Sequence, residues 1–280
     1  MMKDIMTAQP ETRDSKGASV ISNVIDVLRC FSIEEPLQGV TEIAVQVGLH
    51  KSTVSRILAT LENENIVERD PLSRRFRLGL GIITLAGPLL ADLDVRKVAH
   101  PVLQELSRET GETAALVLWN ETESISVEQV VSRSNVKHTS PLGTSYGTAL
   151  SASVQVFLAL EEEDRVRQLL GSGTIQHPSP DSKGLGAYLT RLGDVRSRGY
   201  AVNFGETSEE EVGIAVPVHD HRGDVAAAVL ISAPRFRVDK DQLEVLVSAC
   251  VLAAKDITRR LGGRPPVDAG LPQGADSTAG

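Results

Sequence analysis

The stretch of sequence that decides the fold covers residues 40–62 and reads VTEIAVQVGLHKSTVSRILATLE. Apolar residues recur at helical spacing on both sides of Gly48, a residue suited to the positive φ at a helix end. We therefore predict a short helix from Thr41, a four-residue turn, and a second helix from Lys51 to about Asn63. This arrangement is typical of a helix-turn-helix, whose second helix enters the major groove of DNA.

The second predicted helix has an apolar inner face and a short, polar and basic outer face. Side chains at the start of such a helix reach base edges in the major groove. The residues expected to contact DNA from this helix and from the start of the preceding one are Thr41, Lys51, Ser52, Thr53, Ser55, Arg56 and Thr60.

Two short strands are predicted at residues 66–69 and 75–78, around a turn at residues 70–74. They form a wing with four arginines, of which Arg74 and Arg75 are the main candidates for phosphate or minor-groove contacts. The alternative is a packing module with an ordinary polar surface. We favour DNA binding because we expect the basic residues to share one side, while the acidic residues at 34, 35, 42, 62 and 64 lie on other surfaces.

Five segments organise the chain. Residues 1–16 and 263–280 are polar or rich in Gly and Pro, so disordered tails are expected there. Residues 17–79 form the winged helix-turn-helix domain, and residues 80–94 form an apolar linker helix that is kinked or begins near Pro88. Residues 95–262 form the second domain.

In the second domain the pattern alternates between helix and strand. The predicted strands cover residues 114–119, 124–131, 200–204, 213–219 and 225–232, and the predicted helices cover residues 95–110, 148–160, 162–170, 185–198 and 240–261. Hairpin strands with helices grouped around them indicate an α+β fold on an antiparallel sheet, which can enclose a pocket.

Composition sets limits on function. The chain has 280 residues, 41% of them hydrophobic, and a net charge of −8, which argues against coating nucleic acid through bulk positive charge. With no membrane-spanning run and no signal peptide, we expect a cytoplasmic protein. We do not expect an enzyme, because the only hydrolase-like motif, at residues 143–147, lies in the wrong structural context. The two cysteines, Cys30 and Cys250, fit buried reduced thiols, and no metal or other cofactor is expected.

The residues also carry a family resemblance. The runs VTEIA (40–44), GLHKSTVSRILATLE (48–62), VERD (67–70) and RLG (77–79) resemble the IclR-type transcriptional regulators. The resemblance continues at RGY (198–200), GE (205–206), AVPV (215–218) and SAP (232–234), and covers about residues 17–261.

This resemblance implies an effector-binding domain with a sheet of the GAF or profilin type. It also implies a homodimer that pairs through the linker helix and is further organised as a dimer of dimers. This assembly would bind a double-stranded DNA operator whose half-sites lie about 34 Å or a multiple apart. A small organic acid would change the operator affinity. The residues expected to bind this effector are Thr144, Ser145, Tyr146, Gly147, Asn203, Glu206, Gly213, Ile214, Leu230 and Ser232.

Thr144 and Ser145 have a physical rationale, because we expect a helix to start near Gly147. Their hydroxyls and the exposed N–H groups would then bind a carboxylate, or would simply cap the helix. The chain departs from the family at Thr148, where lysine is common, at Gly213, where cysteine is common, and at Leu230, where serine is common; Asn203 stands where aspartate is frequent. These departures favour a roomier, more apolar pocket and a bulkier or aromatic acid.

Three other interpretations of the second domain stand beside the effector-binding one. Residues 143–147 fit G-x-S-x-G, the motif of a serine esterase with Ser145 as nucleophile, although the expected antiparallel context is wrong for that motif. His219 and His221 form an H-x-H pair, but at a hairpin turn, where exposed histidines explain it better than a metal site. Finally, the second domain of a DNA-binding protein with these departures would only oligomerise and bind no effector.

Overall fold

The computed structural model of the protein describes residues 14–32, 35–92, 94–178 and 182–264. The chain divides into two compact units, residues 1–92 and 93–280. Most of the two predicted tails lies outside the described residues. Where the tails are described, residues 14–16 already belong to the first helix, and Gly263 is buried with its N–H donating to the Thr258 carbonyl.

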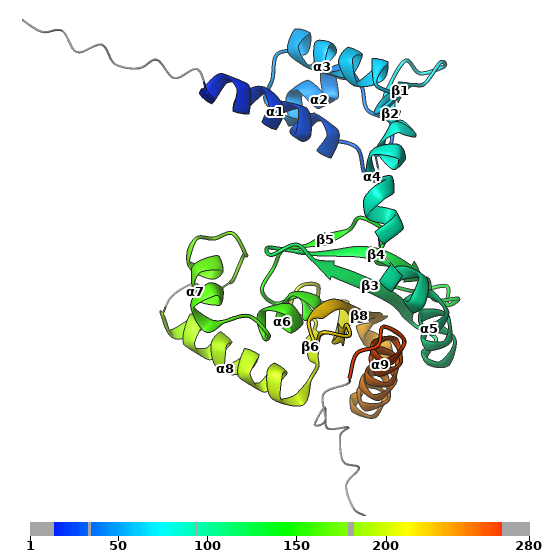
Figure 1. Ribbon diagram of the computed structural model, residues 1–280, viewed down its shortest axis with the longest axis vertical. Helices are drawn as coiled ribbons and strands as arrows, with labels where there is room; N and C mark the ends of the chain where they lie inside the picture. The colour runs from blue at the N-terminus through cyan, green and yellow to red at the C-terminus, as the bar shows by residue number, and fades with distance from the viewer. Residues whose placement is uncertain (1–13, 33–34, 93, 179–181, 265–280) are drawn as a thin grey trace, which may run out of the picture. The chain divides into compact units, whose positions relative to one another are not determined.

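The first unit has the predicted winged helix-turn-helix architecture (Figure 1). Its elements are α1 (Asp14–Arg29), α2 (Val40–Gln46), α3 (Lys51–Asn63), β1 (Val67–Arg69), β2 (Phe76–Leu78) and α4 (Gly81–Asp92). Its core draws side chains from all three first helices and from both strands, including the fully buried Val27, Ile43, Val54 and Leu58. The helical spacing of these apolar residues is what fixes α3 against α1 and α2.

Three glycines fix the turns of this unit, one by its backbone conformation and two by close approach to a neighbouring carbonyl. Gly48 has φ +65°, the left-handed conformation that ends α2 and allows α3 to begin three residues later. A Cβ atom at Gly79 or Gly81 would lie only 2.4 or 2.6 Å from the Asn65 carbonyl oxygen. Glycine is therefore required where the chain leaves the wing and enters α4, a helix that runs through Pro88.

The second unit is the predicted α+β domain. Its helices are α5 (Asp94–Thr110), α6 (Ala152–Leu158), α7 (Glu163–Gly171), α8 (Ser182–Arg198) and α9 (Lys240–Arg260), with a 3-10 turn at Arg235–Arg237. Its strands are β3 (Thr113–Trp119), β4 (Ser124–Val130), β5 (Ser145–Tyr146), β6 (Ala201–Phe204), β7 (Glu211–His219) and β8 (Val225–Pro234). They form one antiparallel sheet in the order β5-β4-β3-β8-β7-β6.

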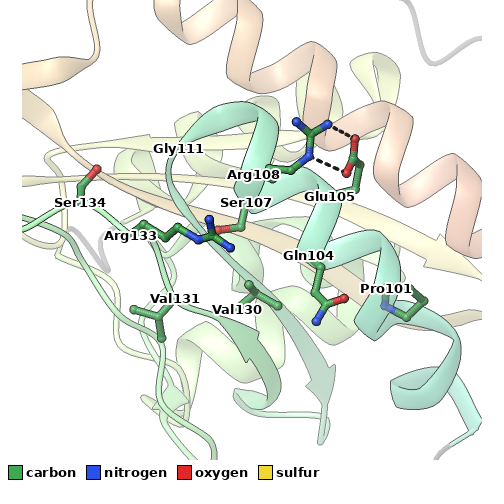
Figure 2. Close-up of a pocket in the computed structure, with 10 residues that line it drawn as sticks. All are labelled: Pro101, Gln104, Glu105, Ser107, Arg108, Gly111, Val130, Val131, Arg133 and Ser134. Carbon is green, nitrogen blue, oxygen red and sulfur yellow. Dashed lines mark hydrogen bonds and ion pairs between the residues drawn. The ribbon is translucent and has the colours of Figure 1, made fainter.

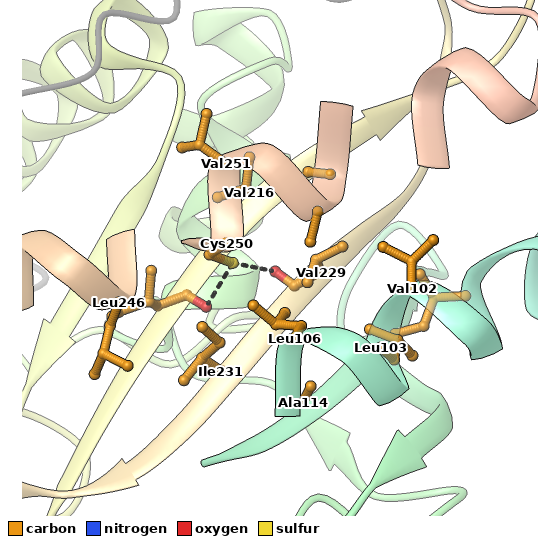
Figure 3. Packing of buried hydrophobic residues seen from close by; sticks show 14 of the residues in the cluster. Val102, Leu103, Leu106, Ala114, Val216, Val229, Ile231, Leu246, Cys250 and Val251 are labelled. Carbon is orange, nitrogen blue, oxygen red and sulfur yellow. Dashed lines mark hydrogen bonds between the residues drawn. The ribbon is translucent and has the colours of Figure 1, made fainter. Parts of the chain in front are cut away.

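Each face of this sheet has its own core. Helices α5 and α9 cover one face, and α6 with α8 covers the other (Figure 1). In the first core, Cys250 of α9 is fully buried against Val229 and Ile231 of β8 (Figure 3). Burial raises the pKa of the Cys250 thiol, so this cysteine stays protonated, as its predicted role as a buried thiol requires.

One predicted element is wrong. The helix expected near Gly147 begins at Ala152, and Ser145 with Tyr146 instead forms the edge strand β5, paired with β4. The backbone of Ser126 bonds both Gly143 and Thr144, which draws this segment onto the sheet edge. Thr144 and Ser145 therefore do not precede a helix N-terminus, and the physical rationale for a carboxylate site there fails.

Candidate nucleic-acid interface and ligand cavity

The outer surface of helix α3 is polar because its apolar side chains are buried in the core. Val54 and Leu58 are fully buried, and Leu61 is nearly so. The remaining positions face outward as predicted: the exposed ones are Lys51, Ser52, Ser55, Arg56 and Thr60, and the half-buried one is Thr53. Thr41 at the start of α2 is also exposed.

The cations of this surface are available to a partner. Among the described residues, Lys51 and Arg56 have neither an ion pair nor a side-chain hydrogen bond. The Thr60 hydroxyl donates to the Arg56 carbonyl (3.0 Å), and His50 Nδ1 lies 3.1 Å from the Ser52 hydroxyl oxygen. Those contacts hold the ends of the surface in place and leave the guanidinium and ammonium groups unpaired.

The wing is shaped by Asp70. Its carboxylate accepts hydrogen bonds from the Ser73 backbone (2.6 Å), the Ser73 hydroxyl (2.8 Å) and the Leu72 backbone (3.1 Å). These bonds, the Ser73 backbone first, hold the pKa of Asp70 below its ordinary value. The turn they make places Arg74 at the tip, exposed and with φ +60°.

The expected separation of basic and acidic residues is wrong for the rest of the wing. Arg75 pairs with Glu42 and also donates to the Leu37 carbonyl (3.2 Å). The other two wing arginines are also held by acidic neighbours: Arg69 lies 3.7 Å from Glu62, and Arg77 lies 2.5 Å from Glu68. Close packing brings these carboxylates beside the wing, so its unpaired cation within the described residues is Arg74.

The second unit contains a small, partly open cavity, here called the α6 cavity. It lies between the start of α6 and strands β5 to β8, and has a volume of about 50 Å³. Its lining residues are Tyr146, Thr148, Ser151, Ala152, Asn203, Thr207, Glu211, Gly213 and Leu230. Four hydroxyl groups and one amide share the lining with apolar groups, one carboxylate and no cation. An anionic ligand would therefore be held by hydrogen bonds alone and would be repelled by the Glu211 carboxylate.

Asn203 forms hydrogen bonds with three different parts of the polypeptide around the cavity. Its amide nitrogen donates to the Leu150 carbonyl (2.8 Å) and to the Thr207 hydroxyl (2.7 Å), and its amide oxygen accepts from the Glu206 backbone (2.9 Å). Glu206 in turn forms a two-pronged ion pair with Arg191 of α8. The loop after β6, the approach to α6 and α8 are thereby connected through one nearly buried side chain.

Two hydroxyl groups of the lining contact hydroxyl groups of residues outside the cavity. Tyr146 lies 2.8 Å from the Ser140 hydroxyl, and burial is the main cause that raises its pKa. Ser151 lies 3.1 Å from the hydroxyl of Ser153, which lies 2.6 Å from that of Ser124. The polar groups around the cavity are thus mostly satisfied from within.

The predicted effector residues separate into two groups. Tyr146, Asn203, Gly213 and Leu230 line the α6 cavity. The others do not: Ser145 donates to Glu123, Glu206 is held by Arg191, Ile214 belongs to the core on the opposite sheet face, and Ser232, Thr144 and Gly147 are not among the lining residues. Ile214 is turned away because side chains alternate along β7, so that it and Gly213 face opposite sides.

Five lining residues were missed as effector contacts, namely Thr148, Ser151, Ala152, Thr207 and Glu211. A serine directly before the apolar run 152–159 was a usable signal for the start of α6, since serine is a preferred N-terminal residue of helices. The cavity is smaller than the roomy pocket that the family departures favour. A Cβ atom at Gly213 would lie 3.6 Å from that of Ala152, an ordinary contact, so this glycine leaves space for little more than one methyl group.

Both domains match known families. Residues 20–71 match the IclR helix-turn-helix domain, and residues 88–259 match the family described as Bacterial transcriptional regulator IclR C-terminal. The chain belongs to the IclR family. It is a DNA-binding transcriptional regulator.

Full-length relatives agree with this assignment. The chain is 30% identical over 257 residues to the HTH-type transcriptional regulator KipR of Bacillus subtilis, covering 89% of this chain and 98% of KipR. It is 30% identical to KdgR of Escherichia coli, covering 86% of this chain and 94% of KdgR.

Solved structures share the fold. The crystal structure of a domain from an IclR-family regulator is 59% identical, with a TM-score of 0.60, and covers 62% of this chain and 99% of that one. An IclR regulator from Silicibacter is 26% identical, with a TM-score of 0.72, and covers 90% of this chain and 99% of that one.

The other chemical interpretations gain no support from the geometry of this IclR-family chain. Ser145 lies on an antiparallel edge strand, not at the strand-to-helix turn that a serine esterase requires. His219 Nδ1 lies 3.1 Å from the Gly223 carbonyl oxygen inside the hairpin turn. The described part of the chain holds no group of three side chains suited to a metal ion, and none of its helices is long and apolar enough to cross a membrane.

Proposed function

We propose that this IclR-family regulator places α3 in the major groove of its operator and changes its operator affinity when a small organic acid occupies the α6 cavity. The observation that carries the DNA part is the exposed outer surface of α3 with its unpaired Lys51 and Arg56. Arginine and lysine at the start of such a helix supply both base and phosphate contacts. Arg74 at the wing tip adds a further phosphate contact.

The working form that we propose is a homodimer, organised as a dimer of dimers. Exposed apolar side chains on α1 and α4 support it, because isolated helices seldom leave several such groups in water. These are Val20 and Ile21 of α1, Ile83 and Leu85 of α4, and Leu80 directly before α4, all more than half exposed. Sedimentation of the wild type against Ile83→Glu tests this: the charged variant should fall to a smaller species, and an unchanged mass contradicts the interface.

The effector part rests on the lining of the α6 cavity. Hydroxyl donors at Tyr146, Thr148, Ser151 and Thr207 suit a carboxylate, and Gly213 leaves space beside Ala152. An IclR homolog from Microbacterium hydrocarbonoxydans is complexed with 4-hydroxybenzoate; it is 23% identical and has a TM-score of 0.72 over 86% of this chain and 98% of that one. An aromatic acid would require α6 to move, because ligand pockets usually reach about 300–1,000 Å³.

A second candidate follows from the same volume. A cavity of about 50 Å³ with mostly satisfied polar groups also fits a regulator whose second domain oligomerises and binds no effector. A deciding experiment is titration of operator DNA, taken from the flanks of the gene, with wild type and Gly213→Ala in the presence of aliphatic and aromatic acids.

Gly213→Ala is a suitable test because the added methyl group makes only ordinary contacts with its neighbours and occupies part of the cavity that Gly213 lines. We expect one acid to change wild-type operator affinity by about 5- to 150-fold, the usual range of allosteric coupling, and this response to disappear in Gly213→Ala with DNA affinity retained. A wild-type shift indifferent to every acid favours the ligand-independent regulator. No operator binding at all contradicts the DNA assignment of α3.

A further inference from the structure

The largest cleft of the second unit for which lining residues are described has no role in the function proposed above. This α5 cleft has a volume of about 550 Å³, within the usual range for small-molecule sites. It lies between the second half of α5 and the end of β4 with the residues that follow (Figure 2). Its lining residues are Pro101, Gln104, Glu105, Ser107, Arg108, Gly111, Val130, Val131, Arg133 and Ser134, none of which lines the α6 cavity.

The charges of the α5 cleft leave one unpaired cation. Arg108 is held by Glu105, with its Nε 2.8 Å from the carboxylate, and also lies 3.9 Å from Glu109. Arg133 is exposed and has no ion pair or side-chain hydrogen bond within the described residues. In Figure 2 its side chain extends from the loop after β4 toward α5. Because the charges of Glu105 and Arg108 cancel, the lining carries one net positive charge, that of Arg133.

A hydroxyl group that is accessible from the cleft also lacks a partner. Ser107 is only 7% exposed, lines the cleft, and makes no side-chain hydrogen bond within the described part of the chain. Its neighbours are different: Thr110 donates to the Leu106 carbonyl (2.7 Å), and Ser132 donates to the Gly111 carbonyl (2.5 Å). These two hydroxyls are therefore committed within the protein, whereas the Ser107 hydroxyl is available to a ligand, and the negative C-terminal end of α5 favours the cation of Arg133 beside it.

Of the remaining lining residues, Val130, Val131 and Pro101 are apolar, while Gln104 and Ser134 are polar. Val130 and Val131 come from the end of β4 and the residue after it, and Val131 is 39% exposed. Pro101 closes the other end from α5. The cleft therefore combines an anion-binding end with an apolar surface large enough for a ring or a short alkyl chain.

We propose that the α5 cleft is a second ligand site, specific for an organic monoanion with an apolar body. The carboxylate accepts hydrogen bonds from the Arg133 guanidinium and the Ser107 hydroxyl, and the body lies on Val130, Val131 and Pro101. Arginine recognises a carboxylate through paired N–H donors, and its charge-assisted bonds are about twice as strong as neutral ones. The site binds independently of the α6 cavity.

The test is calorimetric titration of the full-length protein with benzoate, and with benzyl alcohol as the neutral analogue. We expect benzoate to bind the wild type and benzyl alcohol to bind much more weakly. Arg133→Gln should weaken benzoate binding at least about tenfold, and Ser107→Ala should weaken it severalfold. Arg222→Gln, which alters an exposed arginine in the β7–β8 turn, is the matched control and should leave the titration unchanged.

Gly213→Ala separates the two sites. Benzoate binding that survives in Gly213→Ala and fails in Arg133→Gln supports the α5 cleft, whatever the outcome for the α6 cavity. Benzoate binding that is lost in Gly213→Ala and kept in Arg133→Gln overturns the proposal. The proposal is also overturned if the wild type shows no heat of binding with benzoate at millimolar concentration. Sedimentation is the last check: a smaller oligomer for Arg133→Gln assigns the cleft to contacts between copies of the chain and also overturns the proposal.

Discussion

Helices α3 and α6 begin in similar ways and end up in opposite environments. Each carries a serine as its second residue, Ser52 in α3 and Ser153 in α6. Ser52 is exposed, whereas Ser153 is completely buried and lies within hydrogen-bond distance of Ser124 and Ser151. Every residue of α6 is buried, and α3 buries only its apolar stripe.

This difference separates polar groups that are available to a partner from those that hold the fold together. A hydroxyl that already has a buried partner contributes to stability, and its loss leaves that partner unsatisfied. An exposed hydroxyl or cation contributes little to stability, so its presence at a particular place is better explained by what it binds. The surface of α3 belongs to the second class, and most polar groups around the α6 cavity belong to the first.

Arg56→Ala should have the largest effect on DNA binding and tests most directly whether the exposed surface of α3 contacts the operator. Arg56 is exposed and unpaired, so its loss should leave the melting temperature unchanged and should remove a direct DNA contact. A well-placed arginine contact is worth about 1–3 kcal/mol, so operator affinity should fall by about 5- to 150-fold. Fluorescence anisotropy with operator and with random DNA measures this. Unchanged operator affinity would move the interface away from α3.

Ser153→Ala and Ser52→Ala form a matched pair. Removing the buried Ser153 hydroxyl deprives Ser124 of its partner and should lower the free energy of unfolding by about 1–2 kcal/mol, with operator affinity kept in the folded fraction. Ser52→Ala should do the reverse, with stability within about 0.5 kcal/mol and severalfold weaker operator binding. Urea unfolding and DNA titration of both variants decide it. If Ser52→Ala is the less stable of the two variants, the exposure of a hydroxyl group does not distinguish DNA contacts from stabilising contacts in this chain.

The sequence predicts the first unit better than the second for a physical reason. Around Gly48, local signals agree: helical spacing of Ile43, Val54 and Leu58 and a glycine at the helix end act within a few residues of one another. The outer surface of α3 then follows from the inner one by geometry alone. The five longer strands and the helices of the second unit were also predicted, because alternation and hairpin turns are local as well.

The contacts of side chains distant in sequence were not predictable in this way. The pairing of Arg75 with Glu42 and of Arg69 with Glu62 depends on where the wing packs against α2 and α3. Strand β5 exists because β4 offers it an edge, and its two residues carry no strand pattern of their own. The α6 cavity likewise depends on five separate segments meeting, so its lining could be predicted only in part.

Arg77→Ala should have the smallest effect, and it sharpens the distinction between paired and unpaired cations. Arg77 lies 2.5 Å from Glu68 on the neighbouring strand, and both are about half exposed, so this ion pair contributes at most about 1 kcal/mol to stability. To contact a phosphate, Arg77 must leave Glu68, which offsets most of the gain. We therefore expect Arg77→Ala to weaken operator binding less than about threefold, well below the loss for Arg56→Ala.

Glu68→Gln is the matched control, because it releases Arg77 without removing it. This variant should bind operator DNA slightly more tightly than the wild type, and its affinity should fall more steeply with salt, since one more cation neutralises phosphate. Titrations at two salt concentrations measure both effects. If Arg77→Ala instead costs as much as Arg56→Ala, the wing arginines exchange their carboxylate partners for phosphate on binding, and pairing in the unbound protein does not identify the DNA contacts.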